Sequence, residues 1–209
     1  MIKRTINRLF IYKNALNHFK KLGFVKVFSD NLADAVGVTP SQVRKDFSAF
    51  AISGNRRGGY RVNDLLENIN KILGKNKVEE VIVVGSGNIG RALIRYNEGF
   101  MKENIKIVAA FDTDSSKADR DNAIPILPFE EMADFIREKG IKVGIIAVPD
   151  GAAQHVFEVM ANAGIKGVMN FAPIMLKGTP TAVISNVNLA LELENIIYYV
   201  NAGESAAYL

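Results

Sequence analysis

The middle of the chain contains the segment Val81-Ile-Val-Val-Gly85-Ser-Gly87-Asn-Ile-Gly90. Its first four residues are all apolar, which is typical of a parallel strand buried on both faces. The glycines have the spacing GxGxxG and are followed by a helical pattern, the context in which this motif binds a dinucleotide. Gly85 permits a tight turn, Gly87 lets the backbone approach a pyrophosphate, and Gly90 allows close packing of helix on strand. We expect a loop that holds the phosphates on helix N-terminal amides, made of Gly85, Ser86, Gly87, Asn88, Ile89 and Gly90.

A second strand is expected over residues 105–111, and it ends in Asp112-Thr-Asp114. An acidic residue about 20 positions beyond the glycines commonly holds the adenosine ribose hydroxyls. Asp112 closes the strand and is the first candidate, with Asp114 behind it. Because a carboxylate here disfavours a 2′-phosphate, the sequence favours NAD over NADP. The alternative is an ordinary strand-end aspartate that caps a loop.

Strands and helices continue to alternate after this point. We expect strands near 124–126 and at 143–148, 166–170 and 183–186, and helices at 129–139 and 152–163. Residues 78–186 therefore form one doubly wound parallel sheet, an α/β domain of the Rossmann type. A last amphipathic helix over 188–201 lies beyond the finished sheet, within a terminal segment 187–209. Its apolar surface suggests packing against a partner subunit, hence a homodimer.

Charge divides the chain in a way that its net value of +4 conceals. Residues 1–77 carry 15 Lys or Arg against 5 Asp or Glu, whereas residues 78–209 carry 11 against 17. A basic first third joined to an acidic remainder suggests two domains with different partners. Polyanion binding belongs to the first domain, because phosphates neutralised by Lys or Arg release condensed counterions. The alternative is a solvated basic surface without a partner.

The basic third reads as a helix-turn-helix. Helices are expected over 5–21 and 29–36, the second with Ser29 as N-cap, and a third follows Thr39-Pro40 with Gln42 as a capping-box partner. A buried stripe on the third helix leaves its polar and basic residues open. Such a helix lies in a major groove, where Gln and Arg read base edges and Lys binds guanine or phosphate. The candidate DNA-binding residues of this helix are Ser41, Gln42, Arg44, Lys45 and Ser48.

The glycine-rich segment 53–60 follows the third helix and carries Arg56 and Arg57. Glycines and an asparagine around two arginines indicate the tip of a β-hairpin. A hairpin behind a recognition helix is a wing, whose arginines enter a minor groove or bind phosphates. The alternative is a surface turn with two solvated arginines. A helix over 63–73 and a polar linker at 74–77 complete a winged-helix domain, residues 1–77, for double-stranded DNA.

Composition excludes several kinds of site. The chain has no cysteine, so disulfides, thiolate zinc sites and cysteine nucleophiles are absent. Its two histidines, His18 and His155, are too few for a histidine-rich metal site, and we expect no metal and no catalytic residue. No apolar run approaches the roughly 18 residues that span a bilayer, and no signal peptide is evident, so we expect a cytoplasmic protein without a membrane partner. A remote alternative is a small NAD-dependent oxidoreductase or CoA-binding protein with an unrelated basic arm.

Taken together, these motifs resemble the Rex family of redox-sensing transcriptional repressors over nearly the full length. The segments that carry the resemblance are 42–48 (QVRKDFS), 84–93 (VGSGNIGRAL), 110–114 (AFDTD), 146–149 (IAVP), 153–154 (AQ), 164–173 (GIKGVMNFAP) and 186–187 (NV). The resemblance implies a homodimer with winged helices on an inverted-repeat operator, Rossmann domains that bind NADH or NAD, and a C-terminal helix exchanged between subunits. It also implies repression of fermentative and respiratory genes and release from DNA when NADH accumulates.

The resemblance carries roles to individual positions. Gln42, Arg44, Lys45 and Arg56 would serve DNA. The loop from Gly85 to Gly90 would hold the pyrophosphate and Asp112 the adenosine ribose. The residues that would line the nicotinamide side are Val148, Pro149, Asn170 and Phe171.

Departures from the family pattern concern the switch. Family members often have an Asp followed by Phe at the start of the exchanged helix, where this chain has Asn188 and Leu189. That Asp alternates between a Tyr, matched here by Tyr96, and an Arg of the first helix, aligned here with Asn14. Asn cannot form the ion pair, and Leu cannot supply an aromatic wall. In the wing, Arg57 and Ala51 replace customary glycines. An alternative function is therefore a Rex-like regulator without the redox response, which binds DNA constitutively or answers another adenine nucleotide.

Overall fold

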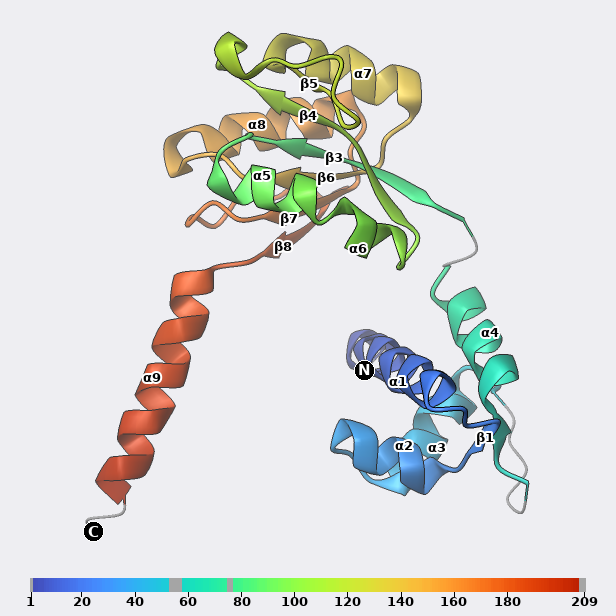
Figure 1. Cartoon of the computed structure of the whole chain (residues 1–209). Helices are drawn as coiled ribbons and strands as arrows, with labels where there is room; N and C mark the ends of the chain where they lie inside the picture. Colours follow the sequence, from blue (N-terminus) through green and yellow to red (C-terminus); the bar gives the residue numbers. More distant parts are fainter. Residues whose placement is uncertain (1, 53–57, 75–76, 207–209) are drawn as a thin grey trace. The chain divides into compact units, whose positions relative to one another are not determined.

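The computed structural model of the chain describes residues 2–52, 58–74 and 77–206. The chain divides between Lys77 and Val78 into two compact units (Figure 1). Each unit has its own apolar core. Each is therefore described by itself.

The first unit packs four helices around a small apolar core. Its elements are α1 (Ile2–Lys21), β1 (Lys26–Val27), α2 (Ser29–Val36), α3 (Pro40–Ala49), β2 (Tyr60–Arg61) and α4 (Val62–Ile72). Leu9, Tyr12 and Leu16 form one buried stripe of α1, at the helical spacing that the sequence shows. Buried residues of α3 and α4 complete the same core. The expected helix-turn-helix is confirmed.

The cap of α2 differs from the one predicted, and that of α3 is as predicted except for the role of the Gln42 side chain. The N-cap of α2 is Phe28 and not Ser29, because the Asn31 Oδ1 accepts the Phe28 N–H at 2.8 Å and draws Ser29 into the helix. Thr39 caps α3 as expected, its Oγ1 accepting the Gln42 N–H at 3.1 Å. The Gln42 side chain, however, reaches forward along α3 and does not close a capping box.

The predicted wing is described only in part. β2 pairs antiparallel with β1, with Val27 opposite Tyr60 and Lys26 opposite Arg61. The described partner of this strand therefore lies before α2. The expected tip, with Arg56 and Arg57, lies outside the described residues.

The second unit is a six-stranded, wholly parallel sheet in the order β5-β4-β3-β6-β7-β8. Its elements are β3 (Glu79–Val84), α5 (Asn88–Arg95), α6 (Asn97–Met101), β4 (Ile105–Asp112), β5 (Ile126–Pro128), α7 (Met132–Lys139), β6 (Val143–Ile146), α8 (Asp150–Ala163), β7 (Gly167–Asn170), β8 (Val183–Asn186) and α9 (Leu189–Ala206). One face packs on α7 and α8, and the other on α5 and α6 (Figure 1). The doubly wound sheet expected from the sequence is confirmed.

Two connections of this sheet were not predicted. The short helix α6 follows α5 directly, and its Phe100 packs on the sheet with α5. Between β4 and β5 the described chain forms only a 3-10 turn, Ser115–Lys117, in place of a full crossover helix. β6 also ends at Ile146, two residues before the predicted end. The terminal helix α9 keeps its large apolar side chains more than half exposed at positions such as Leu193, Ile196 and Ile197.

Candidate functional site

The predicted cofactor residues gather at one edge of the sheet. Strand order reverses between β3 and β6, and ligands of doubly wound sheets bind at the carboxyl ends of the strands beside such a reversal. The glycine loop follows β3, Val148 and Pro149 follow β6, and Asp112 ends β4. Asn170 ends β7 in the same parallel sheet. The structure thus brings together segments that are up to 85 residues apart in the chain.

The three glycines have different local environments. Gly85 has a φ of +97°, and a Cβ there would lie 2.4 Å from the Ala147 carbonyl oxygen. At Gly90 a Cβ would lie 1.8 Å from the Gly85 carbonyl oxygen, so α5 rests directly on the turn. A Cβ on Gly87 would meet nothing within 4 Å. The turn and the packing are thus filled by backbone, and open space remains only at Gly87, where a phosphate would approach.

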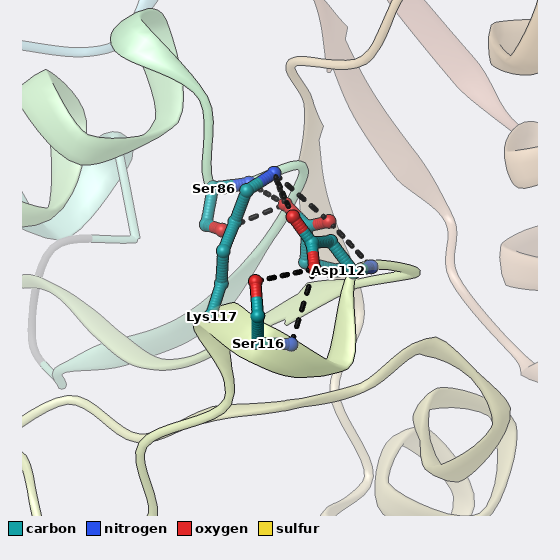
Figure 2. A network of polar contacts seen from close by, with 5 residues as sticks. Ser86, Asp112, Ser116 and Lys117 are labelled. Atoms are coloured by element: carbon teal, nitrogen blue, oxygen red, sulfur yellow. Dashed lines mark hydrogen bonds and ion pairs between the residues drawn. The ribbon is translucent and has the colours of Figure 1, made fainter.

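A polar network joins the glycine loop to the end of β4 (Figure 2). We call it the Asp112 cluster: Ser86, Asp112, Asp114, Ser116 and Lys117. The Asp112 Oδ2 accepts the Ser86 N–H at 2.8 Å and the Ser86 hydroxyl at 2.6 Å. Its Oδ1 accepts the Asp114 N–H at 2.9 Å, and the Lys117 ammonium lies 3.2 Å from Oδ2. This carboxylate therefore holds the loop through contacts within the protein.

The cluster keeps Asp112 ionised. Burial alone would raise the pKa of Asp112, but hydrogen bonds from Ser86, the Asp114 N–H and Lys117 outweigh it and lower the pKa to about 2. Asp114 is the more exposed carboxylate, with 47% of its side chain accessible against 10% for Asp112. Hydrogen bonds from Ser116 lower the pKa of Asp114 as well. Sequence reasoning placed Asp112 correctly at the strand end but missed its bonds to Ser86 and Lys117.

A pocket of about 870 Å³ adjoins the cluster on the side of α5. It shares Ser116 and Lys117 with the cluster and is also lined by Arg91 and Arg95 of α5. Glu98 and Asp119 contribute carboxylates to the same lining. The cluster thus adjoins a pocket whose lining carries charges of both signs together with apolar side chains such as Ile94 and Ile124.

The residues predicted to line the nicotinamide side differ in their exposure and in whether their polar atoms are already hydrogen-bonded. Asn170 is fully buried and its amide is occupied: Nδ2 donates to the Ile174 carbonyl at 2.8 Å and to the Asn186 Oδ1 at 2.9 Å. Its Oδ1 accepts the Ala172 N–H at 3.0 Å. Asn170 therefore shapes the loop after β7. Phe171 and Val148 are half-buried and Pro149 is exposed.

The candidate DNA-binding residues of α3 fall into two groups. Ser41, Arg44, Lys45 and Ser48 are exposed. Gln42 is half-buried, and its Nε2 donates to the Asp46 Oδ1 at 2.7 Å. Sequence reasoning expected Gln42 on or beside the open side, and it did not identify the partner Asp46.

Asp46 is the centre of a second polar network, which we call the α3 anchor: Arg8, Tyr12, Gln42 and Asp46. Arg8 of α1 donates to both Asp46 oxygens, at 2.5 and 2.6 Å, and the Tyr12 hydroxyl donates to Oδ2 at 2.9 Å. Burial opposes the charge of Asp46, but the bonds from Arg8, Tyr12 and Gln42 prevail and lower its pKa. Burial and the bond to Asp46 raise the pKa of the Tyr12 hydroxyl. The anchor ties α3 to α1 through an ionised, buried carboxylate.

The predicted switch residues lie on exposed parts of their elements. Tyr96 ends α5 with 62% exposure, its ring edge-on to Phe100 at 5.2 Å. Asn14 is exposed on α1. The Asn188 Oδ1 accepts the Leu191 N–H at 3.1 Å and so caps α9, and Leu189 is 58% exposed. Helix capping is a use of Asn188 that the sequence analysis did not identify.

The described part of the chain contains neither a cluster of metal ligands nor a membrane-spanning helix. Over residues 2–52, 58–74 and 77–206, no group of three or more His, Asp or Glu side chains is placed to hold a metal ion. Across the same ranges no helix combines the length and apolarity required to cross a bilayer.

Comparisons with known proteins agree on one family. A family model described as "CoA binding domain" matches residues 76–174, and one described as "Putative DNA-binding protein N-terminus" matches residues 3–48. The redox-sensing transcriptional repressor Rex of Desulforamulus reducens is 40% identical over 195 residues, which cover 93% of this chain and 92% of that protein.

Two solved structures of a Rex-family repressor, RSP, are similar over almost the whole chain. The complex with β-NAD⁺ and operator DNA has a TM-score of 0.91 at 32% identity, covering 99% of this chain and 95% of that one. The complex with β-NADH has a TM-score of 0.86 at 32% identity, covering 98% and 96%. The chain belongs to the Rex family of redox-sensing transcriptional repressors.

Proposed function

We propose that this protein is a homodimeric transcriptional repressor that binds an operator through its first unit and NADH or NAD through its second. NADH releases the operator and NAD permits binding. The observation that carries this proposal is the full-length similarity to one repressor captured with NAD⁺ and operator DNA and with NADH. The glycine loop at the strand-order reversal supplies the matching site in this chain.

Roles follow for the residues of the second unit. The pyrophosphate rests on the amides from Gly87 to Gly90, because α5 begins there and space is open above Gly87. The ribose hydroxyls lie beside Asp112 and Asp114. The nicotinamide side is formed by Val148 and Pro149, which follow β6, and by Phe171, on the loop after β7 that Asn170 holds in shape.

The first unit binds DNA through α3 and the wing. The exposed side chains of Arg44, Lys45, Ser41 and Ser48 face the groove and its phosphates, and Gln42 reads a base. Arg56 and Arg57 grip phosphates or a minor groove. The exchanged element of the dimer is α9, whose apolar side chains are exposed within a single chain.

Two narrower statements belong to the same proposal. The protein acts in the cytoplasm, where a bacterial repressor meets its DNA. It is not an enzyme, because its relatives are transcriptional repressors.

The decisive experiment titrates NADH and NAD into a protein–DNA complex. The duplex is one that the purified full-length protein enriches from a pool with a randomised segment. NADH should dissociate the complex at a concentration at least tenfold below that of NAD, because a ligand shifts an equilibrium only through differential affinity. Equal dissociation by both nucleotides would reject redox sensing and leave DNA binding intact.

Gly87→Val tests the cofactor site separately. The substitution meets no protein atom within 4 Å of its Cβ, so the fold should persist while the valine fills the phosphate approach. The variant should bind the selected duplex normally but not respond to NADH. Unaltered NADH affinity in this variant would show that the loop is not the site.

A second candidate function is a Rex-like regulator without a redox response. The observation that favours it is Asn188, a neutral side chain that is already used to cap α9, together with the neutral Asn14. The family's ion pair cannot form between them. In this case neither NADH nor NAD releases the duplex, and coenzyme A, suggested by the family model over residues 76–174, is the next nucleotide to titrate.

A further inference from the structure

We propose that Asp46 is a positioning residue that fixes the orientation of the Gln42 amide, so that Gln42 offers its oxygen to the DNA and selects a base with an exocyclic amine, adenine or cytosine. This inference rests on the proposed DNA-binding function. It adds the chemistry by which one residue of α3 chooses its base.

The position of Gln42 suits a reading residue. It is the third residue of α3, and the first turn of a recognition helix lies nearest the base edges. Its backbone N–H is held by the Thr39 cap at 3.1 Å, which fixes the start of the side chain. Its Nε2 is held by the Asp46 Oδ1, one helical turn further on, at 2.7 Å. Both ends of the side chain are therefore restrained.

The partner allows only one orientation of the amide. An ionised carboxylate accepts hydrogen bonds and donates none. If the amide were flipped, its oxygen would face the Asp46 carboxylate, which is 2% exposed and receives Arg8 and Tyr12 on its other sides. Since those bonds lower the pKa of Asp46, the carboxylate stays ionised at neutral pH. The Nε2 must point to Asp46 and the Oε1 away from it.

The free end of the amide is thus an acceptor. Within the described residues, the Gln42 Oε1 accepts no hydrogen bond. In the major groove, adenine N6 and cytosine N4 are the donors, whereas guanine O6 and N7 and thymine O4 are acceptors. An outward Gln42 Oε1 can therefore accept a hydrogen bond from adenine N6 or cytosine N4, and it is repelled by the acceptors of guanine and thymine. The second N–H of Nε2 also remains, which suits adenine with its neighbouring N7.

Arg44 and Lys45 provide the internal contrast. Both are exposed on α3, and both carry only donors. They suit guanine and phosphate, which accept. The α3 anchor therefore gives the helix one acceptor group of fixed orientation among donors, and a sequence preference that the cations cannot supply.

The test compares how strongly the wild-type protein and Gln42→Met bind duplexes that differ in a single base atom. The duplex is again selected by the full-length protein from a randomised pool, and Gln42→Met identifies the base pair whose preference is relaxed. At that pair the exocyclic amine is removed, with purine in place of adenine or 2-pyrimidinone in place of cytosine. Removal should weaken wild-type binding about tenfold and leave Gln42→Met unaffected. Coupling of Gln42 only to guanine O6 or N7, or to thymine O4, would overturn the inference.

Asp46→Asn tests the positioning role. An asparagine can donate as well as accept, so the Gln42 amide is free to flip, and the coupling to the exocyclic amine should fall at least threefold. Glu67→Gln on α4 is the matched control, because it makes the same change in charge at an exposed site of the same unit. Coupling that survives in Asp46→Asn would overturn the positioning role.

A measurement on the wild-type protein guards against misfolding of Asp46→Asn. One Nε2 proton of Gln42, assigned by its absence in the Gln42→Met spectrum, should exchange with solvent at least tenfold more slowly than its geminal partner. Two equally fast protons would overturn the inference. If the protein enriches no duplex at all, it is the proposed DNA-binding function that fails.

Discussion

Helices α3 and α5 each turn their first residues toward a proposed ligand, yet they are held by opposite means. α3 is fastened to α1 by side chains, through the bonds of Arg8 and Tyr12 to Asp46. α5 packs directly on the turn after β3, because Gly90 has no side chain and its backbone lies against the Gly85 carbonyl.

The difference shows what each arrangement tolerates. A charge network loses stability when one partner is removed, because the other charge is left buried and unpaired. A backbone contact leaves no room for any added atom, so even one methyl group must displace a strand or a helix. The buried aspartate of the second unit's site, Asp112, binds the loop before α5 and the turn after β4, and it does not bind α5 itself.

The largest effect is expected where backbone meets backbone. Gly90→Ala puts a Cβ 1.8 Å from the Gly85 carbonyl oxygen. We expect it to destabilise the second unit by about 4 kcal/mol, above the usual range for overpacking because the clash is with backbone. Amide hydrogen exchange of β3 and β4 in the full chain measures the loss in that unit.

The matched control is Gly87→Ala in the same loop, whose Cβ would meet nothing within 4 Å. It should leave the exchange rates of β3 and β4 within a factor of about three of wild type. Equal effects of the two alanines would mean that the glycines share one role, and the contrast between α3 and α5 would lose its basis.

The next effect concerns the α3 anchor. Arg8→Met keeps the packing of the aliphatic stem but leaves the Asp46 carboxylate, 2% exposed, without its cation. We expect a loss of about 3 kcal/mol in the first unit, read from the exchange of α1 and α3 amides. Lys117→Met is the counterpart in the second unit, and it should cost less because Lys117 is 30% exposed. A loss at Lys117 as large as that at Arg8 would contradict the comparison.

The two helices also differ in how far the sequence predicts them. The glycine turn requires glycines at a fixed spacing in the sequence. The roles of Gly85, Gly87 and Gly90 could therefore be predicted before the structure was known. Asp112 could be placed for a similar reason, because it closes an apolar strand. The parallel sheet followed from the same alternation of apolar runs and helical patterns.

The α3 anchor has no such local signal. Arg8 and Asp46 are 38 residues apart, and each reads as an ordinary charged residue of a basic helical segment. Only the spacing of Gln42 and Asp46, one helical turn, was available as a hint. The contacts of Asn170 and Asn188 were missed for a related reason: their amide oxygens accept the backbone N–H groups of Ala172 and Leu191, and a sequence motif does not reveal such contacts.

The smallest of the three expected losses of stability is that of Asp112→Asn. Its pH dependence tests whether Asp112, like Asp46, acts through its charge. The pKa of Asp112 is lowered from 3.8 to about 2 in the folded protein. A lowered pKa stabilises the fold fully above pH 3.8, and this contribution disappears as the pH falls through about 2. Asp112→Asn carries no titrating group, so it should cost about 2 kcal/mol at pH 7 and progressively less below pH 4.

Urea unfolding of the full chain at pH 7 and at pH 3 measures this change. Asp134→Asn on α7, where the carboxylate is 77% exposed beside Arg137, is the control and should cost less than about 1 kcal/mol at either pH. A loss in Asp112→Asn that is independent of pH would mean that the hydrogen bonds to Ser86, and not the charge, hold the loop. Asp112 would then act as a hydrogen-bond acceptor for Ser86 and not as a charge, unlike Asp46, whose ion pair with Arg8 ties α3 to α1.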